Sequence, residues 1–357
     1  MLERILGFTE GMSACELRRA VEIMKVMIVR ELRGPDEEPT SCPHCGSEHI
    51  VKKGLQKPDD GDANAEVTQR FLCKNCNRTF NKRTNGVLSQ SKLKAWQWVR
   101  FVELMLRKAS LAKCELECRV SAPTAHFMRC RICMVMAKAV PAFACREGER
   151  VEVDGTYVNE SLCGLGRRGG AMPRVSHRSG NDVREHGISN MKVCVLCGVS
   201  ESGDVFLELC DRGRPSDKAL AESLRGKVKG AVVVTDAHQG YGRVLPGLGV
   251  ASHEAYEKGG SELGRVNALH QRYKDFLRPF NGVSTRYIDM YTYWFKYVEY
   301  LRHSDADDLE SMFGLAASGR YFLTRSALNG RERPFWDYWE DKLPEIDAES
   351  IWGPDAA

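Results

Sequence analysis

No apolar run in the 357-residue sequence approaches the roughly 20 residues that a membrane-spanning helix requires. The opening residues, MLERILGFTEGM, lack the basic start and apolar core of an export signal, so we expect a cytoplasmic protein. The chain also lacks internal repeats and low-complexity tracts, which sets repeat architectures aside. A chain of this length has room for two or three domains, with a sizeable core in at least one of them.

Cysteine is abundant, and its spacing is informative. The chain has fourteen cysteines, and several of them form CxxC pairs. This usage is typical of a protein that binds metal in a reducing compartment rather than of a disulfide scaffold.

Charge is distributed unevenly along the chain, although the net charge is only +4. Residues 66–140 hold fifteen Lys and Arg against four Glu, a net charge of +11. Residues 301–357 hold six basic side chains against twelve acidic ones, a net charge of −6. The basic block predicts a polyanionic partner, but charge alone does not separate DNA from RNA or from a membrane surface.

Hydrophobic patterning divides the sequence into segments. Residues 1–38 carry the amphipathic stretch CELRRAVEIMKVMIVRELRG, which predicts a packing or dimerisation helix. Residues 85–147 are helical in pattern, most clearly in KAWQWVRFVELMLRKA. Residues 148–303 alternate apolar runs (RVEVDGTYV, MKVCVLCGVS, DVFLELC, AVVVTD) with Gly-rich turns and helical stretches, which predicts an α/β domain. Residues 304–357 form an acidic tail with the aromatic cluster RPFWDYWEDKL.

Residues 39–84 contain two CxxC pairs whose spacing predicts a metal site. CPHC and CKNC are separated by 27 residues, and each pair can wrap a tight turn that points both thiolates at one ion. Four sulfur ligands suit tetrahedral zinc, so we expect a structural zinc ribbon with these ligands: Cys42, Cys45, Cys73 and Cys76. His44 and His49 are alternative ligands that a four-cysteine site does not need.

Two further CxxC pairs have a weaker pattern. Cys130 and Cys133 lie in a helical stretch, and Cys194 and Cys197 lie in a strand-like one. Positions three apart on a strand point to opposite faces. We therefore expect buried structural cysteines at both pairs.

Residues 110–134 have the pattern of a helix-turn-helix. The first helix is expected to end near Cys118, and Ser121 is a candidate cap for a second helix that starts at Pro123. A second helix of this kind lies in the DNA major groove, and the candidate contacts on it are Thr124, His126, Arg129 and Arg131. A purely structural helical hairpin is the alternative, and the surrounding positive charge favours DNA.

Two aspartates stand inside apolar strand patterns. Asp154 lies in RVEVDGTYV, and Asp236 ends the strand in VVVTDAHQGY. A carboxylate in a sheet is costly to bury without a partner or an ion. Adjacent strands would bring the two carboxylates together around Mg²⁺ or Mn²⁺. The alternative for Asp236 is a cap of the following turn.

A third ligand is expected on a helix after these strands. Asn267 can offer its carbonyl oxygen to a metal, and Lys274 follows seven residues later, close to two helical turns. The two side chains therefore share one helix face, from which Lys274 can contact phosphate or hydroxyl.

The order of these motifs, from the two CxxC pairs to VNALHQRYKDFL and GVSTRYIDMYTYWF, resembles bacterial insertion-sequence transposases. It is similar to the family with an amino-terminal zinc ribbon, a helix-turn-helix and an ISXO-type RNase H-like catalytic domain, and it covers residues 40–300. The resemblance implies a multidomain α+β and α/β protein, in which an RNase H-like mixed sheet with flanking helices follows the DNA-binding domains.

The resemblance also implies a DDE-type transposase. Asp154, Asp236 and Asn267 would hold Mg²⁺ or Mn²⁺, and Lys274 would be the trailing lysine. The implied chemistry is cleavage at the element ends to leave a 3′-hydroxyl, followed by in-line attack of that hydroxyl on target DNA. The implied partners are double-stranded DNA (terminal inverted repeats and target) and a second copy of the chain, in a homodimer or higher oligomer on the nucleoid.

The sequence departs from the family pattern at two positions. Asn267 replaces the acid of most such transposases, and Glu262 is an alternative third ligand. Gly155 follows the first aspartate where Glu is common in the family. Five arginines in the Gly-rich loop 164–187, among them Arg167 and Arg168, are expected either to grip the DNA backbone or to lie on a solvated insertion.

Two other functions remain open from the sequence. A zinc-ribbon and helix-turn-helix regulator would use the same DNA-binding segments but would not need two strand-borne carboxylates. An RNase H-like nuclease without transposition activity would need the carboxylates but has less use for a separate basic block.

Overall fold

The computed structural model describes most of the chain, in two compact units. The first unit comprises Met1–Val140 and Ser304–Asn329, and the second comprises Pro141–His303 and Gly330–Ala357. The described residues are 38–56, 68–82, 84, 89, 91–164, 187–256, 261–303 and 323–340. The expected amino-terminal helix, the arginine-rich loop from 165 onward and most of the acidic tail lie outside them. Within the described ranges, no helix is long and apolar enough to cross a membrane.

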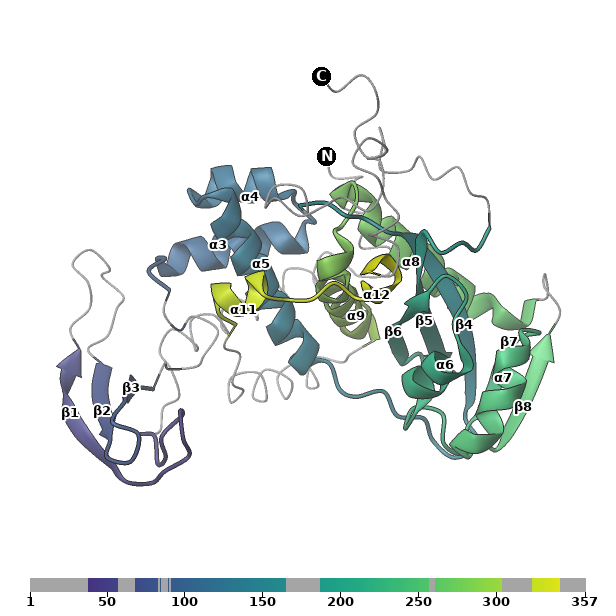
Figure 1. The fold of residues 1–357 in the computed structure, drawn as a ribbon, viewed down its shortest axis with the longest axis horizontal. Helices are drawn as coiled ribbons and strands as arrows, with labels where there is room; N and C mark the ends of the chain where they lie inside the picture. Colours follow the sequence, from purple (N-terminus) through teal and green to yellow (C-terminus); the bar gives the residue numbers. More distant parts are fainter. Residues whose placement is uncertain are drawn as a thin grey trace, which may run out of the picture. The chain divides into compact units, whose positions relative to one another are not determined.

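The first unit contains a small three-stranded antiparallel sheet, ordered β1 (Ile50–Gln56), β2 (Thr68–Cys73) and β3 (Thr79–Asn81) (Figure 1). Phe71 and Phe80 face each other across β2 and β3, with ring centroids 5.6 Å apart. They and two cysteines are the buried residues of this sheet's core. So few apolar side chains give little stability by themselves, and domains of this size commonly depend on a metal.

Three helices follow in the same unit: α3 (Ala95–Leu106), α4 (Leu111–Cys118) and α5 (Ala122–Ala139). The buried side chains of α3 recur at the three- and four-residue spacing of its amphipathic pattern: Trp98, Phe101, Val102, Leu104 and Met105. The turn between α4 and α5 places Arg119 in the left-handed region and Ser121 at the N-cap of α5. A short helix, α11 (Arg325–Asn329), also belongs to this unit.

The second unit contains a five-stranded mixed sheet in the order β6-β5-β4-β7-β8. Its strands are β4 (Arg150–Asn159), β5 (Lys192–Ser200), β6 (Val205–Arg212), β7 (Val232–Asp236) and β8 (Ser252–Tyr256). β4, β5 and β6 pair antiparallel, whereas β7 pairs parallel to β4 and β8 parallel to β7. The apolar runs predicted the first four strands. They missed β8, whose sequence SHEAY is polar and only half-buried.

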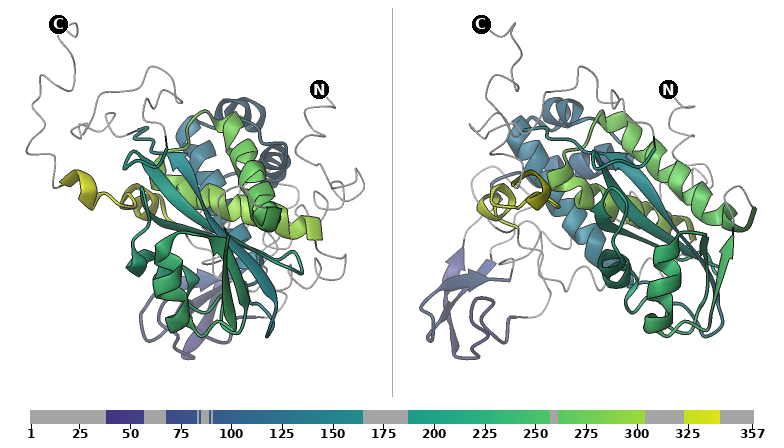
Figure 2. Two further views of the ribbon diagram at one scale, coloured as in Figure 1. Left: turned by 90° about the vertical axis from the view of Figure 1, so that its right-hand side faces the viewer. Right: turned by 45° about the vertical axis from the view of Figure 1, so that its right-hand side comes forward.

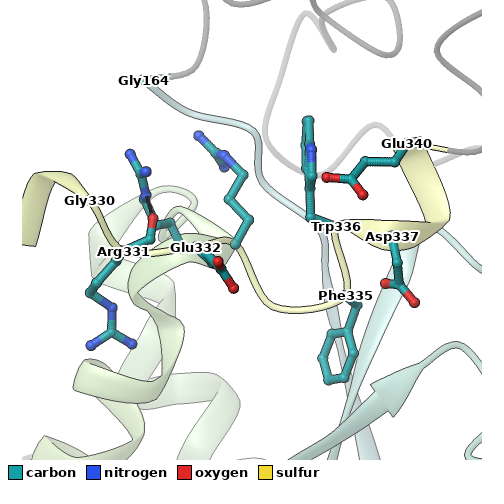
Figure 3. A pocket seen from close by; sticks show the side chains of 10 residues that line it. Gly164, Gly330, Arg331, Glu332, Phe335, Trp336, Asp337 and Glu340 are labelled. Carbon is teal, nitrogen blue, oxygen red and sulfur yellow. Dashed lines mark hydrogen bonds between the residues drawn. The ribbon is translucent and has the colours of Figure 1, made fainter.

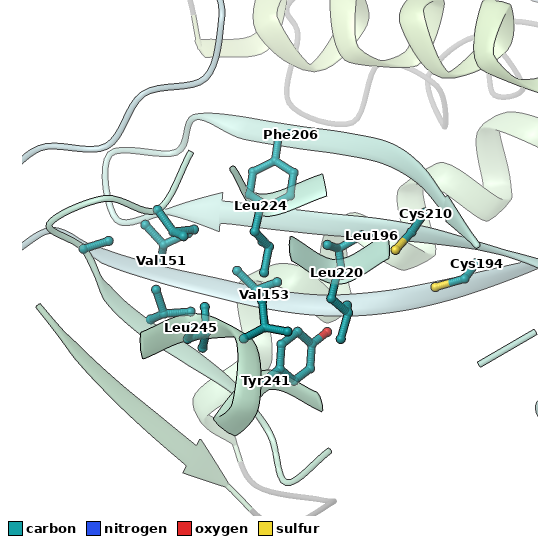
Figure 4. Packing of buried hydrophobic residues seen from close by; sticks show 14 residues of the cluster. Val151, Val153, Cys194, Leu196, Phe206, Cys210, Leu220, Leu224, Tyr241 and Leu245 are labelled. Carbon is teal, nitrogen blue, oxygen red and sulfur yellow. The ribbon is translucent and has the colours of Figure 1, made fainter. Parts of the chain in front are cut away.

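One face of this sheet is covered by α6 (Asp217–Leu224) and α7 (Gln239–Val244) (Figures 1 and 2). Ser216 caps α6 through a bond from the backbone N–H of Ala219. Figure 4 shows the core between these helices and the strands, which includes Val151, Val153, Cys194, Leu196, Phe206, Leu220 and Tyr241. Alternate residues of β4, Val151 and Val153, therefore point into this core.

The opposite face is covered by α8 (Gly264–Leu277). Helix α9 (Ile288–His303) packs against both β6 and α8. The Glu152 carboxylate accepts a 3.0 Å hydrogen bond from the backbone N–H of Val266, in the first turn of α8. A carboxylate there satisfies an otherwise unpaired helix donor and complements the helix dipole. The connecting 3-10 turns are η2 (Leu245–Leu248), η3 (Ser261–Leu263), η4 (Arg278–Phe280) and η5 (Thr285–Tyr287).

The carboxy-terminal helix α12 (Asp337–Glu340) is anchored to the second unit by a buried ion pair. Arg212 pairs with Glu160, and both side chains are at most 5% exposed. The indole N–H of Trp339 donates to both carboxylate oxygens of Glu160, at 3.0 and 3.1 Å. The Arg212 guanidinium lies 4.6 Å from the centre of the Tyr338 ring. These contacts satisfy a pair of buried charges that would be costly if one partner were lost.

We expect Gly198→Ala to destabilise the second unit. Gly198 pairs with Phe206 across β5 and β6, and a Cβ at this glycine would lie 2.0 Å from the Phe206 ring. Because that ring is fully buried against the core, overpacking should cost about 1–3 kcal/mol in the free energy of unfolding. Chemical denaturation measures this cost, and Gly247→Ala, where no atom lies within 4 Å, is the matched control. Equal stability of the two variants would contradict the packing described here.

Candidate functional site

The two strand-borne aspartates lie on one face of the five-stranded sheet, on the neighbouring strands β4 and β7. The parallel pairing of β4 with β7 aligns Glu152 with Val234, and Asp154 and Asp236 each follow two residues later. Residues two apart on a strand share a face, and neighbouring strands lie about 4.8 Å apart. Both charges also act on Tyr241, where burial and the two carboxylates raise the pKa of the hydroxyl well above its usual value.

Asp236 also takes part in the turn that follows its strand. Its Oδ1 accepts a 3.2 Å hydrogen bond from the backbone N–H of His238. The helix cap itself is His238, whose Nδ1 accepts from the N–H of Gly240 at 3.2 Å. No hydrogen bond between described residues uses Oδ2 of Asp236. The carboxylate therefore stabilises the turn with one oxygen and keeps the other for a different partner.

His270, on α8, is a site residue that the sequence reasoning missed. Its Nδ1 lies 4.0 Å from Oδ2 of Asp154, and its side chain is 9% exposed. Burial, with a smaller effect from the charge of Lys274, lowers the pKa of His270 to about 4. The ring is therefore neutral at pH 7, and its buried Nε2 has no hydrogen-bond partner. The i, i+3 relation to Asn267 was the sequence signal that could have identified it.

The other candidates on α8 lie on the same helix face as His270. Asn267 is one turn earlier and Lys274 one turn later, and both are exposed. Lys274 is close enough to act electrostatically on His270. Glu262 lies in η3, which packs against both β4 and β7, and it is half-buried. Asn267 and Glu262 thus both remain candidates for a third ligand.

The residues around Asp154 are closely packed. Gly155 leaves space for the Cys194 thiol, because a Cβ at position 155 would lie 3.1 Å from its Sγ. Cys197 pairs with Asp154 across β5 and β4 and is fully buried. Burial and the negative charge of Asp154 raise the pKa of Cys197 well above its usual value. Cys194 and Cys197 thus face opposite sides of the sheet, as their spacing predicts, and they do not form a metal pair.

The four cysteines of the small sheet form a compact cluster. Their Sγ atoms all lie within 4.8 Å of one another, and the distances between Cys42 and Cys76 and between Cys45 and Cys73 are both 3.6 Å. A tetrahedral zinc site with bonds of about 2.3 Å has sulfur–sulfur edges of about 3.8 Å. The cluster can therefore hold one zinc ion.

Backbone hydrogen bonds to the cysteine sulfurs favour thiolate ligands. The backbone N–H of His44 donates to Cys42 Sγ at 3.4 Å, and that of Cys76 donates to Cys73 Sγ at 3.5 Å. The N–H of Cys76 is the main cause that lowers the pKa of Cys73 to about 6. Four sulfurs leave no coordination position for a substrate, so a site of this kind is structural.

Helices α4 and α5 place the candidate DNA contacts differently from the sequence expectation. Thr124 and His126 are half-buried on the amino-terminal part of α5, and the Thr124 hydroxyl lies 3.0 Å from that of Ser121. Arg129 and Arg131, which we expected on the outer face, are each 2% exposed.

The two arginines bind backbone carbonyls of their own unit. Arg129 donates to the carbonyl of Ala109 at 2.7 Å, and Arg131 donates to those of Ser89 and Leu323 at 2.8 and 3.0 Å. The sequence of α5 alone could not show that these arginines are buried, because the carbonyls that they bind belong to segments elsewhere in the chain. Arg167 and Arg168 lie outside the described residues.

The comparisons with known proteins give a partial match. An uncharacterized protein in the transposable element ISH50 of Halobacterium salinarum is 31% identical to this chain over 127 residues. The matched stretch is 35% of this chain and 39% of that protein, so the chain spans well under two thirds of the relative's length. No protein-family model matches the chain, and no solved structure matches it.

We expect the purified protein to contain about one zinc per chain, held by the four clustered cysteines. Cys73→Ser replaces a buried ligand with a hydroxyl and should release the metal, which elemental analysis measures. The small sheet should then lose its thermal transition, since its core has few other buried residues. Cys163→Ser, at an exposed cysteine outside the cluster, is the control and should keep the zinc. A zinc-free protein with an intact small sheet would overturn this assignment.

Proposed function

We propose that the chain is a DDE-type DNA transposase that cleaves DNA at the ends of an insertion sequence and joins them to target DNA. The observation that supports the proposal is that Asp154 and Asp236 each lie two residues beyond the last printed pair of the neighbouring strands β4 and β7, on the same face of the sheet. The partial identity to a transposable-element protein supports the same function. We assign the five-stranded unit to an RNase H-like catalytic domain and residues 39–84 to a zinc ribbon.

The donor set fits a hard divalent cation. Two carboxylates on one face of adjacent strands repel each other when they are close, and carboxylate oxygens are preferred ligands of Mg²⁺ and Mn²⁺. Asp154 and Asp236 would hold the ion, with Asn267 or Glu262 as the third ligand. When bound, the ion supplies Lewis-acid activation of a phosphodiester and of the attacking hydroxyl or water.

The protein groups around the carboxylates have distinct roles in this proposal. Neutral His270 packs 4.0 Å from Asp154 without forming a strong ion pair, so it positions the carboxylate and leaves its charge available to the metal. Exposed Lys274 contributes a positive charge on the same helix face, suited to a DNA phosphate. Glu152, which caps α8, fixes that helix against the strand that carries Asp154.

The first unit supplies DNA binding in this proposal. Residues 66–140 carry a net charge of +11, and α4 and α5 are joined by a short turn of the helix-turn-helix type. We assign the groove contacts to the start of α5, with Thr124 and His126, and backbone contacts to Arg167 and Arg168. The expected partners are the terminal inverted repeats, target DNA and a second copy of the chain on the nucleoid.

Two alternative functions predict different behaviour. A DNA-binding regulator would bind the same DNA without needing the pair of strand carboxylates. A nuclease without transposition activity would cleave DNA but would not join a 3′-end to a second duplex. A strand-transfer assay on DNA that carries the element ends separates all three functions.

Asp236→Asn tests the catalytic assignment. The amide keeps the turn bond to His238, because Asn caps nearly as well as Asp, but it loses the charge that would hold the ion. Cleavage and strand transfer should fall by several orders of magnitude, roughly as when a unit of catalytic residues is disrupted. Asp154→Asn should give the same loss, and the double variant should add little to either.

The control for this test is Asp204→Asn, at an acid in the turn between β5 and β6, which should keep full activity. All variants should keep the melting temperature and DNA affinity of the parent protein. Full strand transfer by Asp236→Asn would reduce this residue to a turn cap and would contradict the proposed function.

DNA binding should depend steeply on salt. Each phosphate contact contributes about −0.9 to the slope of log K against log salt. Arg119→Gln, at an exposed position in the turn between α4 and α5, should weaken binding and reduce the slope magnitude by about 1. Arg225→Gln, an exposed arginine of the second unit, is the matched control. Equal effects of the two changes in a fluorescence-anisotropy titration would contradict the assignment of DNA binding to this turn.

A further inference from the structure

A cavity of about 720 Å³ lies in the second unit, between residues 330–340, the 3-10 turn η5 and the chain after β4. It is lined by Gly164, Arg286, Gly330, Arg331, Glu332, Arg333, Phe335, Trp336, Asp337 and Glu340 (Figure 3). None of these residues belongs to the carboxylate site or to the cysteine cluster. The cavity is therefore a separate site with its own chemistry.

Two arginines of this cavity form no ion pair with an acid in the part of the chain that the structure describes. Arg331 pairs with Asp289, but neither Arg286 nor Arg333 forms an ion pair with a described residue. Arg286 donates through Nε to the backbone carbonyl of Arg331 at 2.6 Å. The hydrogen bonds that Arg333 donates to described residues are both long, at 3.5 Å to Ser284 Oγ and to the Cys163 carbonyl. A half-buried guanidinium with such weak partners is suited to an anion.

The electrostatics of Arg333 support this description. Burial lowers its pKa, and the positive charge of Arg286 lowers it further. An anion between the two guanidinium groups would relieve both effects. The side chains are fixed in part by the Arg286 bond to the chain and by Trp336, whose ring centre lies 5.8 Å from the Arg333 guanidinium.

An aromatic surface stands beside the arginines. Figure 3 shows the Trp336 indole rising from the segment into the cavity, with the Glu340 carboxylate pointing toward it and Phe335 turned away. Phe335 has a φ of 58°, a left-handed conformation that is uncommon for an aromatic residue. This sharp turn directs the two neighbouring rings to opposite sides, which leaves Trp336 half-exposed in the cavity.

The acids of the cavity indicate what kind of anion it suits. Glu332, Asp337 and Glu340 would repel a free phosphate, which offers mainly acceptor oxygens. A nucleotide brings three features together: an anionic phosphate, a flat base and an exocyclic amine. The amines of cytosine and adenine can donate to a carboxylate, and a base of any kind can stack on an indole.

We propose that this cavity binds an unpaired nucleotide of single-stranded DNA. Arg286 and Arg333 hold the phosphate, Trp336 stacks on the base, and Glu340 accepts from a base amine. That the nucleotide belongs to DNA rests on the proposed function, because a DNA transposase exposes unpaired nucleotides at cleaved ends. The site itself is independent of the metal-binding carboxylates.

The test uses the full-length, zinc-loaded protein and a 12-nucleotide single strand that carries one 2-aminopurine, in buffer without added Mg²⁺. Stacking of the modified base on Trp336 should quench its fluorescence. Trp336→Ala should abolish the quenching, and Trp336→Phe should keep most of it. Arg333→Gln should weaken binding roughly tenfold or more, the effect expected from losing a charge-assisted phosphate contact. Arg225→Gln, which removes an exposed charge of the same unit outside the cavity, should change binding less than about twofold.

Quenching that persists in Trp336→Ala, or equal weakening by Arg333→Gln and Arg225→Gln, would overturn the nucleotide site. Complete displacement of the strand by millimolar inorganic phosphate would also overturn it, since stacking would then contribute nothing. If Arg333→Gln lowers the melting temperature, Arg286→Gln replaces it in the comparison. If the protein cleaves DNA with Mg²⁺ but does not quench the 2-aminopurine fluorescence, only the nucleotide site is wrong. If it quenches the fluorescence but does not cleave DNA, only the proposed transposase function is wrong.

Discussion

Strands β4 and β7 pair in parallel, and the arrangement of the second unit depends on this pairing. It aligns Glu152 with Val234, so that Asp154 and Asp236 extend from neighbouring strands on the same face, although 82 residues separate them in the chain. The pairing also assigns the two faces of β4. Valines on one face complete the core beneath α6 and α7, and the carboxylates on the other face meet α8. A shift of one residue would exchange these faces, so burial of the valines holds the carboxylates in place.

Glu152 and His270 lie close to Asp154, and the protein buries each of them in a different way. Glu152 accepts a hydrogen bond, and His270 is neutral. The Glu152 carboxylate is buried, but the first turn of α8 supplies a hydrogen bond and a favourable dipole. His270 is buried and neutral, so it packs beside Asp154 at the cost of one unpaired ring nitrogen. In the proposed function the cation is bound by the two aspartates rather than by these two groups.

Residues 330–340 are anchored to the core of the second unit. Trp339 binds both oxygens of the buried Glu160, and Arg212 completes the pair. Breaking such a buried pair costs about 3–5 kcal/mol when one partner is removed. The anchoring of Trp339 also fixes the chain just before it, so that Arg333 and Trp336 line one cavity.

The sequence by itself determined the features whose signal is local. The spacing of the cysteines specified the four-sulfur cluster, apolar runs specified β4, β5, β6 and β7, and an amphipathic pattern specified α3, because each depends on neighbours within a few residues. The tertiary structure decided the rest. Burial of Arg129 and Arg131, the contact of His270 with Asp154, the polar strand β8 and the docking of Trp339 all depend on segments far apart in the chain. Such contacts form only when the sheet register and the helix faces are set together, so no local pattern records them.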